Sequence, residues 1–324
     1  MRILVTGATG LLGNNLVRIL LEDGHQVTAT IRTRSIPKSL ESLDVDTAYC
    51  DLSKPESISS IMQPFDAIVH SAAKIQVGWT GLEASRKVNV EATRQLARAA
   101  RLRNIRMVHV STVDALSAGA WEQPATEKDR EPAKIQCSYV VSKREAEEAF
   151  AQEVEAGLDG LIVQPGFMVG PWDWKPSSGQ MLLSVAKYWT PLAPSGGCSV
   201  VDVRDVACGI LSAIEHGQRG ENYILAGKNM SYFELWRLMA KVSGGRAPVG
   251  KLPSWINSLA GAFGDLRNRI FNAEPTVNSA ATQMGQIVHF YSSNKAEQAL
   301  GYKVGNIEDA LSDAWDWFQS YGYA

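Results

Sequence analysis

A glycine-rich stretch near the start of the chain places the tightest limit on its fold. Residues 6–13 read Thr-Gly-Ala-Thr-Gly-Leu-Leu-Gly and lie between an apolar run, Arg2–Thr6, and an amphipathic helical pattern. A pyrophosphate needs backbone N–H donors at close range and a helix N-terminus directed at it. Gly7 would allow the tight turn, Gly10 would leave space for the phosphates, and Gly13 would let helix and strand pack closely. The position of the motif therefore predicts a dinucleotide-binding unit rather than a plain strand-to-helix turn.

Strand-like and helical patterns alternate over the first 170 residues. Gly24 stands where the first helix should end, and Ser53-Lys-Pro-Glu56 has the form of a capping box. Apolar strands that alternate with helices pair in parallel through right-handed crossovers. The sequence thus predicts an α/β fold with a Rossmann-type doubly wound parallel sheet, whose further strands are expected at Gln26–Ile31, Thr47–Cys50, Ala67–Ser71, Met107–Val110 and Leu161–Gln164.

The pattern changes after Gly166. Residues 167–199 are rich in Gly, Pro, Ser and Trp and are expected to form long loops around one helix, Met181–Tyr188. Later signals are strands at Ser199–Val203 and Tyr223–Ala226, a helix opening near Asp205, a capping box at Ser231 to Glu234, and a final helix, Ile307–Ser320. We expect a dinucleotide-binding domain over residues 1–166, completed by about 199–227. A smaller, discontinuous, mainly helical substrate-binding domain would comprise residues 167–198 and 228–324.

Charge and cysteine content exclude several classes of partner. The chain has 32 basic and 34 acidic residues, so its net charge of −2 gives no positive excess for a nucleic acid or an anionic membrane. Its four cysteines form no Cys-x-x-Cys pair, and its five histidines show no metal-ligand spacing. No signal-peptide pattern and no apolar run of ~20 residues occurs. We expect a cytoplasmic protein without a metal that acts on a small molecule.

The residues after the second strand bear on the choice of dinucleotide. A carboxylate there would bind the ribose hydroxyls of NAD, but this chain has Arg32 and Arg34 and no carboxylate until Glu41. Arginine can pair with the 2′-phosphate of NADP, which makes NADP the preferred coenzyme and NAD the alternative. Two solvated arginines on a surface loop would give the same sequence. Asp51, after the third strand, is placed either for an adenine contact or for a plain turn.

A Tyr-x-x-x-Lys pattern supplies a candidate catalytic pair. Tyr139 and Lys143 would lie one helical turn apart, and a nearby lysine charge is expected to lower the pKa of the phenol. The same spacing recurs at Tyr291 and Lys295. Tyr139 is favoured because it follows a strand that ends with the hydroxyl residues Ser111 and Thr112, where parallel strands open toward ligands.

Taken together, these motifs resemble the extended short-chain dehydrogenase/reductases, which include the NAD-dependent epimerase/dehydratase family. The nearest subgroup is the bacterial dihydroflavonol-reductase-like proteins, which include members similar to hopanoid-associated sugar epimerases. The resemblance covers essentially the whole chain and rests on residues 6–13, 68–73, 88–90, 110–112, 139–143, 164–166, 201–207 and 294–301.

The resemblance implies roles for individual residues. Tyr139 would be the general acid/base, Lys143 would tune it and hold the nicotinamide ribose, and Thr112, or else Ser111, would polarise the substrate oxygen. Asn89 would either shape the site or satisfy local backbone. The coenzyme-binding residues would be Gly7, Thr9, Gly10, Leu11, Leu12, Gly13, Arg32, Arg34, Asp51, Leu52, Ser71, Ala72, Ala73, Lys74, Tyr139, Lys143, Pro165 and Gly166.

Departures from the family pattern bear on the substrate. Gln164 stands where Arg is common, Ser71 where Leu or Asn is common, and Val113-Asp114 replaces the Asp-Glu pair of sugar-nucleotide dehydratases. Without the first carboxylate, dehydration is disfavoured, and Asp114 is expected to be structural.

We therefore expect an NADP(H)-preferring reductase that moves a hydride between nicotinamide and a carbonyl or secondary-alcohol carbon. The alternatives are a sugar-nucleotide epimerase with tightly bound NAD and a non-catalytic dinucleotide sensor. Trp79, Trp172, Trp174 and Trp189 are expected either to border the substrate cleft or to pack loops. A homodimer is expected from the resemblance alone.

Overall fold

The computed structural model describes residues 1–33, 35–131, 135–253, 255–256, 261–262, 264–265 and 278–324. In this part of the chain, seven parallel strands form one sheet in the order β10-β6-β5-β4-β1-β2-β3. The strands are β1 (Arg2–Thr6), β2 (Gln26–Ile31), β3 (Asp46–Tyr49), β4 (Ala67–His70), β5 (Arg106–Val110), β6 (Gly160–Pro165) and β10 (Asn222–Leu225). The doubly wound sheet is confirmed, and each of these strands begins and ends within one residue of its predicted limits.

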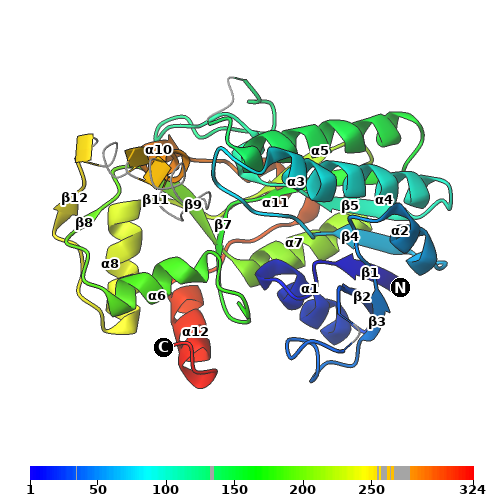
Figure 1. Cartoon of the computed structure of the whole chain (residues 1–324), viewed down its shortest axis with the longest axis horizontal. Helices are drawn as coiled ribbons and strands as arrows, with labels where there is room; N and C mark the ends of the chain where they lie inside the picture. Colours follow the sequence, from blue (N-terminus) through cyan, green and yellow to red (C-terminus); the bar gives the residue numbers. More distant parts are fainter. Residues whose placement is uncertain (34, 132–134, 254, 257–260, 263, 266–277) are drawn as a thin grey trace.

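Helices cover both faces of this sheet (Figure 1). Because side chains alternate along a strand, Ile3 and Val5 pack with the helices of one face, whereas Leu4 packs with those of the other. The first face carries α1 (Leu11–Glu22), α7 (Val203–His216) and α11 (Asn294–Leu300). The second carries α2 (Pro55–Ile61), α4 (Ala92–Arg101) and α5 (Ser138–Glu155), with the short α3 (Leu82–Arg86) against α5.

A second, smaller sheet lies at the side of the first. Its central strand is β9 (Gly197–Asp202), which pairs antiparallel with β11 (Lys228–Ser231) and in parallel with β7 (Phe167–Val169) and β13 (Val288–His289). The strand expected at 199–203 thus belongs to this small sheet. Strand β10 is the last strand of the large sheet, and α7 packs against that sheet. Around the small sheet pack α6 (Gly179–Lys187), α8 (Tyr232–Ser243) and α12 (Ile307–Ser320).

The small sheet and the helices around it form a second lobe, which we call the substrate lobe, and the far end of this lobe is made of short elements. Strand β8 (Leu192–Ala193) pairs with β12 (Gly250–Lys251) at the left edge of Figure 1, beyond α8 and away from the large sheet. Helix α10 (Ser279–Gln286) precedes β13. Among the described residues, no helix has the length and apolar character that crossing a bilayer requires.

Of the two capping boxes that the sequence predicts, one forms and the other does not. The capping box at Ser231 and Glu234 is confirmed, since each side chain bonds the other's backbone N–H at the start of α8. The one expected at Ser53 and Glu56 is wrong. The Ser53 hydroxyl instead donates to Asp51 at 2.7 Å, and α2 begins at Pro55 without a side-chain cap. The acceptor two residues before Ser53 competes successfully for its hydroxyl.

Candidate active site

The predicted site residues meet at one edge of the large sheet. Strand order reverses between β1 and β4, and in open α/β sheets ligands bind outside the carboxyl ends of the strands at such a point. The first glycine loop follows β1, Ser71 follows β4, and Thr112 follows β5. The fold therefore brings the glycine loop and the candidate catalytic hydroxyl to the same crevice.

The three glycines of the loop differ in why the structure favours glycine at each position. Gly7 has φ of +75°, and a Cβ there would lie 2.7 Å from the backbone nitrogen of Ala72. A Cβ on Gly13 would lie 2.2 Å from the Gly7 carbonyl oxygen, so close packing of α1 against the turn after β1 excludes it. At Gly10 the nearest described atom would be the Gly7 oxygen, at an ordinary 3.4 Å. The protein's own packing thus leaves open space above Gly10.

The start of α1 fits a pyrophosphate. Gly10 is its N-cap and has no side chain with which to cap it, and the first turn carries no acidic residue. The N–H groups of a first turn that lack an intrahelical partner attract anions. With the space above Gly10, these features suit the phosphates of a dinucleotide, which Thr9, Leu11 and Leu12 would flank.

Contacts between β1, β4 and the following loop fix the floor of the crevice. The Ser71 hydroxyl donates to the Thr6 carbonyl oxygen at 2.7 Å, so this side chain serves the sheet. Asn89 accepts from the Lys74 N–H at 2.7 Å and donates to the Lys74 carbonyl and to the Ser142 hydroxyl. Asn89 lies in a short π-helix, Lys87–Glu91, and ties the segment after β4, which contains Ala72 and Ala73, to α5. Asn89 thus satisfies local backbone, which is one of the two roles left open for it.

Several other predicted coenzyme residues lie at the same edge. Leu52 follows β3, and Pro165 ends β6. Gly166 comes next, and a Cβ there would lie 2.6 Å from the Ser199 carbonyl oxygen. Close approach of β9 is therefore a sufficient reason for this glycine.

The residues that bear on coenzyme choice lie at the ends of β2 and β3. Arg32 is exposed directly after β2 and forms no ion pair with any described residue. Arg34 lies outside the described residues. The Asp51 carboxylate accepts from the backbone and side chain of Ser53, which lowers its pKa. Asp51 thus has the turn role, and its position after β3 remains compatible with an adenine contact.

Helix α5 presents Tyr139 and Lys143 to the end of β5. The Lys143 side chain is 3% exposed, and its Nζ donates to the Val110 carbonyl oxygen at 2.8 Å. Burial lowers the pKa of Lys143 to about 8, although the Glu147 charge one turn further along raises it. Lys143 therefore carries its charge in a buried position at the carboxyl end of β5.

Tyr139 differs from expectation in the direction of its pKa. Burial raises the pKa of the phenol and the Asp114 charge raises it further, while a hydrogen bond with Thr112 lowers it. The phenol form is therefore favoured over the phenolate, contrary to the expected lowering of the pKa. A protonated Tyr139 beside Thr112 is arranged as a proton donor.

Asp114 is closer to the chemistry than the sequence indicated. Thr112 caps the short 3-10 helix Val113–Ala115, its Oγ1 accepts from the Asp114 N–H at 3.2 Å, and the Asp114 charge acts on Tyr139. His289 from β13 places Nδ1 3.8 Å from the Asp114 carboxylate, and its Nε2 lies 3.4 Å from the Tyr232 hydroxyl. No local sequence pattern indicates this group, because its members come from three distant segments.

The second Tyr-x-x-x-Lys copy is not built like the first. Tyr291 lies ahead of α11, where it forms an isolated bridge with Ala125. Lys295 pairs with Glu221 at 2.7 Å and donates to the Asn222 carbonyl oxygen, at the amino end of β10. Its charge thus lies at the opposite edge of the sheet from the crevice.

The four tryptophans do not form one cluster. Trp172 and Trp174 pack against Trp317 and Tyr321 of the C-terminal segment, and the Arg18 guanidinium lies 3.4 Å above the Trp172 ring. Trp79 donates to the Ser279 hydroxyl, and Trp189 is exposed far from the crevice, beside β8. For Trp172 and Trp174, loop packing is the correct interpretation.

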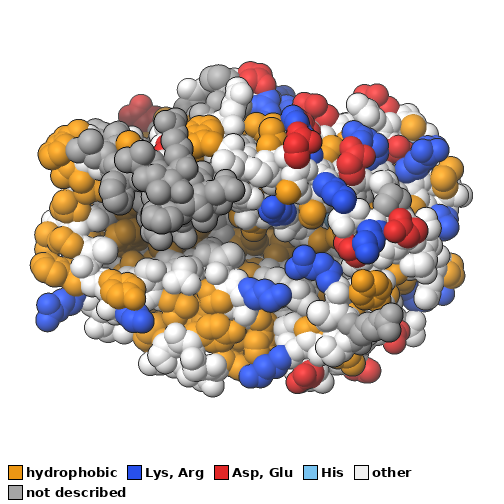
Figure 2. Space-filling view, viewed as in Figure 1, with side chains coloured by type: hydrophobic (Ala, Val, Ile, Leu, Met, Phe, Trp, Pro, Cys, Tyr) orange, Lys and Arg blue, Asp and Glu red, His pale blue; other side chains and the backbone are white. Residues whose placement is uncertain are grey.

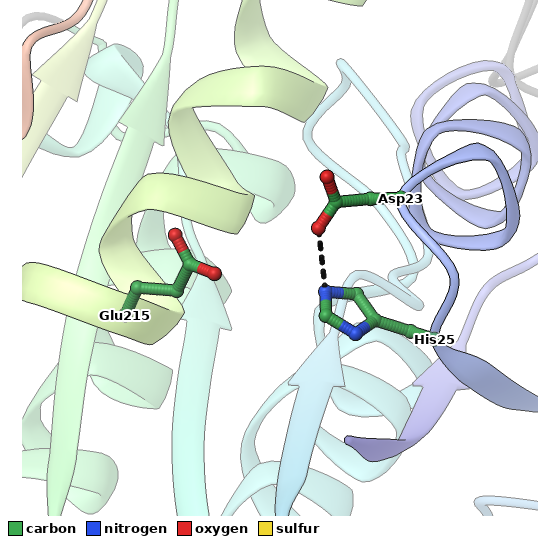
Figure 3. A group of neighbouring side chains, drawn as sticks. All are labelled: Asp23, His25 and Glu215. Carbon is green, nitrogen blue, oxygen red and sulfur yellow. Dashed lines mark ion pairs between the residues drawn. The ribbon is translucent and has the colours of Figure 1, made fainter.

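One group of residues has metal-ligand types within reach of one another. Figure 3 shows Glu215 from α7 facing Asp23 and His25, which precede β2. His25 Nε2 pairs with Asp23 at 3.0 Å, and Nδ1 lies 3.3 Å from the N-terminal ammonium. Both ring nitrogens are thus engaged, at the sheet edge opposite the crevice.

Comparisons with known proteins find relatives that match nearly the whole chain. The model of the NAD dependent epimerase/dehydratase family matches residues 3–226. A dihydroflavonol 4-reductase-like protein of Synechocystis sp. is 34% identical over 98% of this chain and 95% of its own length. The sterol demethylase protein B of Methylococcus capsulatus is 31% identical over 99% of each chain. The crystal structure of gox2253 superposes with a TM-score of 0.86 at 33% identity, covering 99% of this chain and 98% of that one.

Proposed function

This chain belongs to the NAD dependent epimerase/dehydratase family, within the extended short-chain dehydrogenase/reductases, and we propose that it is an NADPH-dependent carbonyl reductase. The observation that carries the proposal is the meeting of Tyr139, Thr112 and Lys143 at the carboxyl end of β5, where the Tyr139 phenol bonds to Thr112 and Lys143 donates to the Val110 carbonyl oxygen. A carbonyl reductase needs at this point a phenol that can give its proton to the substrate oxygen.

The residues would divide the reaction as follows. The bound nicotinamide would supply a hydride to the carbonyl carbon. Tyr139 would give its phenolic proton to the carbonyl oxygen, so that one hydride and one proton yield a secondary alcohol. Thr112 would hold that oxygen while negative charge develops on it. Lys143 would stabilise the phenolate left on Tyr139 until a proton returns from solvent, and would hold the ribose hydroxyls.

Two observations favour reduction over the other reactions of the family. Val113 is buried where the dehydratases carry a carboxylate, so the added acid that dehydration requires is missing. The Synechocystis relative is named for a reductase and matches nearly the whole chain. By this similarity, we infer that the substrate has a ketone next to an apolar or planar framework.

NADP(H) is proposed as the coenzyme because of Arg32. Its exposed guanidinium follows β2 directly, where the adenosine ribose of a nucleotide on this fold would lie, and no ion pair with a described residue competes for it. A bidentate arginine–phosphate pair would favour the 2′-phosphate.

Calorimetry with NADPH and NADH would test coenzyme choice. Arg32→Ala should lower the affinity for NADPH by about ten- to a hundredfold and leave that for NADH unchanged, because one charge-assisted contact is worth about 1.5–3 kcal/mol. Arg98→Ala, an exposed arginine on α4, is the matched control. Equal losses for both nucleotides would contradict the assignment of Arg32.

A turnover assay would test the reaction itself. Purified protein with NADPH should reduce members of a panel of aryl and alicyclic ketones. The epimerase alternative predicts instead that the protein is purified with tightly held NAD and interconverts sugar nucleotides without added coenzyme. Coenzyme binding with no turnover of either panel would favour a sensor.

A further inference from the structure

Acidic side chains are absent from two long segments of the chain. Residues 174–201 and 235–264 contain no Asp or Glu, although the whole chain has more acidic than basic residues. The same two segments carry six cations: Lys175, Lys187, Arg237, Lys241, Arg246 and Lys251. The net charge of −2 therefore conceals a locally basic part of the molecule.

The fold places these two segments side by side. Strands β8 and β12 pair in parallel, and the Pro191 carbonyl oxygen accepts from the Val249 N–H at 2.8 Å. Close contact continues toward α6, since a Cβ on Gly245 would lie 3.0 Å from the Val185 carbonyl oxygen. The basic segments thus form one end of the substrate lobe, remote from the coenzyme crevice (Figure 1).

This end also exposes large apolar side chains. We call it the distal face and define it by Tyr188, Trp189, Val249 and Trp255, which are 57%, 54%, 75% and 65% exposed. Figure 2 shows apolar side chains along its left edge, where Figure 1 places β8 and β12, with Lys and Arg side chains below them. Exposed Trp and Tyr bordered by Lys and Arg are the pattern of a surface that meets lipid headgroups.

A pocket of about 830 Å³ adjoins the distal face. Ala247, two residues before Val249, lines it together with Trp121 and Phe233. Its charged lining is Lys228, Arg237, Lys241 and one acid, Glu234, whose carboxylate is engaged by the Ser231 N–H and hydroxyl. Lys241 pairs with Glu308 of α12 and the Lys228 charge interacts with Glu234, so Arg237 gives the lining its excess of positive charge to attract an anion. The pocket therefore suits a phosphate carried on an apolar or aromatic support.

We propose that the distal face docks on the surface of an anionic lipid bilayer, with its aromatic side chains at the headgroup level and a headgroup phosphate in the adjoining pocket. Lys187, Arg246 and Lys251 border the exposed side chains, and each cation near an anionic surface adds to the attraction. Association is peripheral and reversible, because no segment needs to cross the bilayer. The inference stands apart from the reductase reaction, since docking requires no turnover.

Vesicle co-sedimentation tests the proposal directly. The full-length protein should sediment with vesicles containing about a third phosphatidylglycerol in phosphatidylcholine, and not with pure phosphatidylcholine, and salt should weaken the binding. Reversing Lys187, Arg246 and Lys251 to Glu should weaken it by more than about a hundredfold, since each cation contributes roughly fivefold. Tyr188→Ser with Trp189→Ser should weaken it at all salt concentrations.

Matched controls come from elsewhere on the molecule. Leu102→Ser removes an equally exposed apolar side chain, and Lys128→Glu with Lys303→Glu reverses exposed charges; neither should change vesicle binding. NADPH binding by each variant reports that the coenzyme lobe is folded, and melting curves report on the substrate lobe. Wild-type protein that ignores anionic vesicles overturns the proposal. So does a concentration-dependent dimer that Trp189→Ser dissociates, because the face would then be covered by a second copy.

Discussion

The two Tyr-x-x-x-Lys copies share a spacing, and burial and the Asp114 charge raise the pKa of both phenols, but the structure places their lysines very differently. Tyr139 and Lys143 lie on one continuous helix, so that both side chains reach the end of β5. Tyr291 lies ahead of its helix, and Lys295 turns away to the opposite edge of the large sheet. A four-residue spacing brings two side chains together only where the backbone between them is helical.

The two lysines also differ in their surroundings. Lys143 is buried, and its Nζ meets a backbone oxygen at the crevice. Lys295 is partly exposed and neutralised by Glu221. A buried cation can act on neighbouring groups at low dielectric, whereas an exposed ion pair is screened by water.

The largest expected difference between the copies is in the phenols. Tyr139→Phe should lower kcat for carbonyl reduction by about 10³-fold, because it removes the proton donor, while NADPH binding persists. Tyr291→Phe should leave kcat close to the wild-type value. Steady-state assays with both variants check this, and substantial turnover by Tyr139→Phe would remove the phenol from the mechanism.

Replacing the two lysines should have smaller effects than replacing Tyr139. The change at Lys143 should appear in the kinetics and the change at Lys295 in the stability. Lys143→Met should lower kcat by about 10²-fold and weaken NADPH binding, because the charge beside the phenol and the ribose is lost. Lys295→Met should leave both unchanged and cost at most about 1 kcal/mol in the free energy of unfolding, as for a surface pair. Kinetics and urea denaturation of the two variants distinguish these outcomes, and an equal kinetic loss in both would remove the contrast.

The pH dependence sharpens the contrast further. The pKa of Lys143 is lowered to about 8, so its charge is present below pH 8 and is lost as pH rises through that value. The rate of reduction, as kcat/KM, should therefore fall above pH 8, by up to tenfold per unit, while Tyr139 stays protonated. Lys143→Arg should retain some activity and show no such fall, since arginine keeps its proton. A wild-type profile that is flat to pH 10 would show that the lysine charge is not required.

The sequence was most informative where structure is local. The strands of the large sheet are apolar β-branched runs between turn residues, and each was predicted to within one residue. The expected reason for Gly13, close packing of helix and strand, needs one correction: a Cβ there would lie 2.2 Å from the Gly7 oxygen, so the helix packs against the turn that follows the strand.

The failures come from competition and from long-range contacts. At Ser53 a neighbouring acceptor, Asp51, took the hydroxyl that a capping box requires. The pairing of Asp114 with His289, which in turn lies near Tyr232, has no local sequence signal because these residues lie far apart along the chain. The small sheet around β9 also depends on long-range contacts, since β7, β11 and β13 reach β9 from three separate segments. The direction of the Tyr139 pKa depends on burial, which spacing does not report.

The lack of room for a side chain at Gly13 limits how coenzyme preference can be engineered. Substitutions at Gly7 or Gly13 would disturb the backbone before any nucleotide arrives, so screening libraries at those two codons would return mainly unfolded protein. Arg32 and Thr33 are exposed, so we expect substitutions at these two described residues to be tolerated. A directed-evolution campaign that aims to exchange one dinucleotide for the other should randomise these two positions and leave the glycine loop untouched.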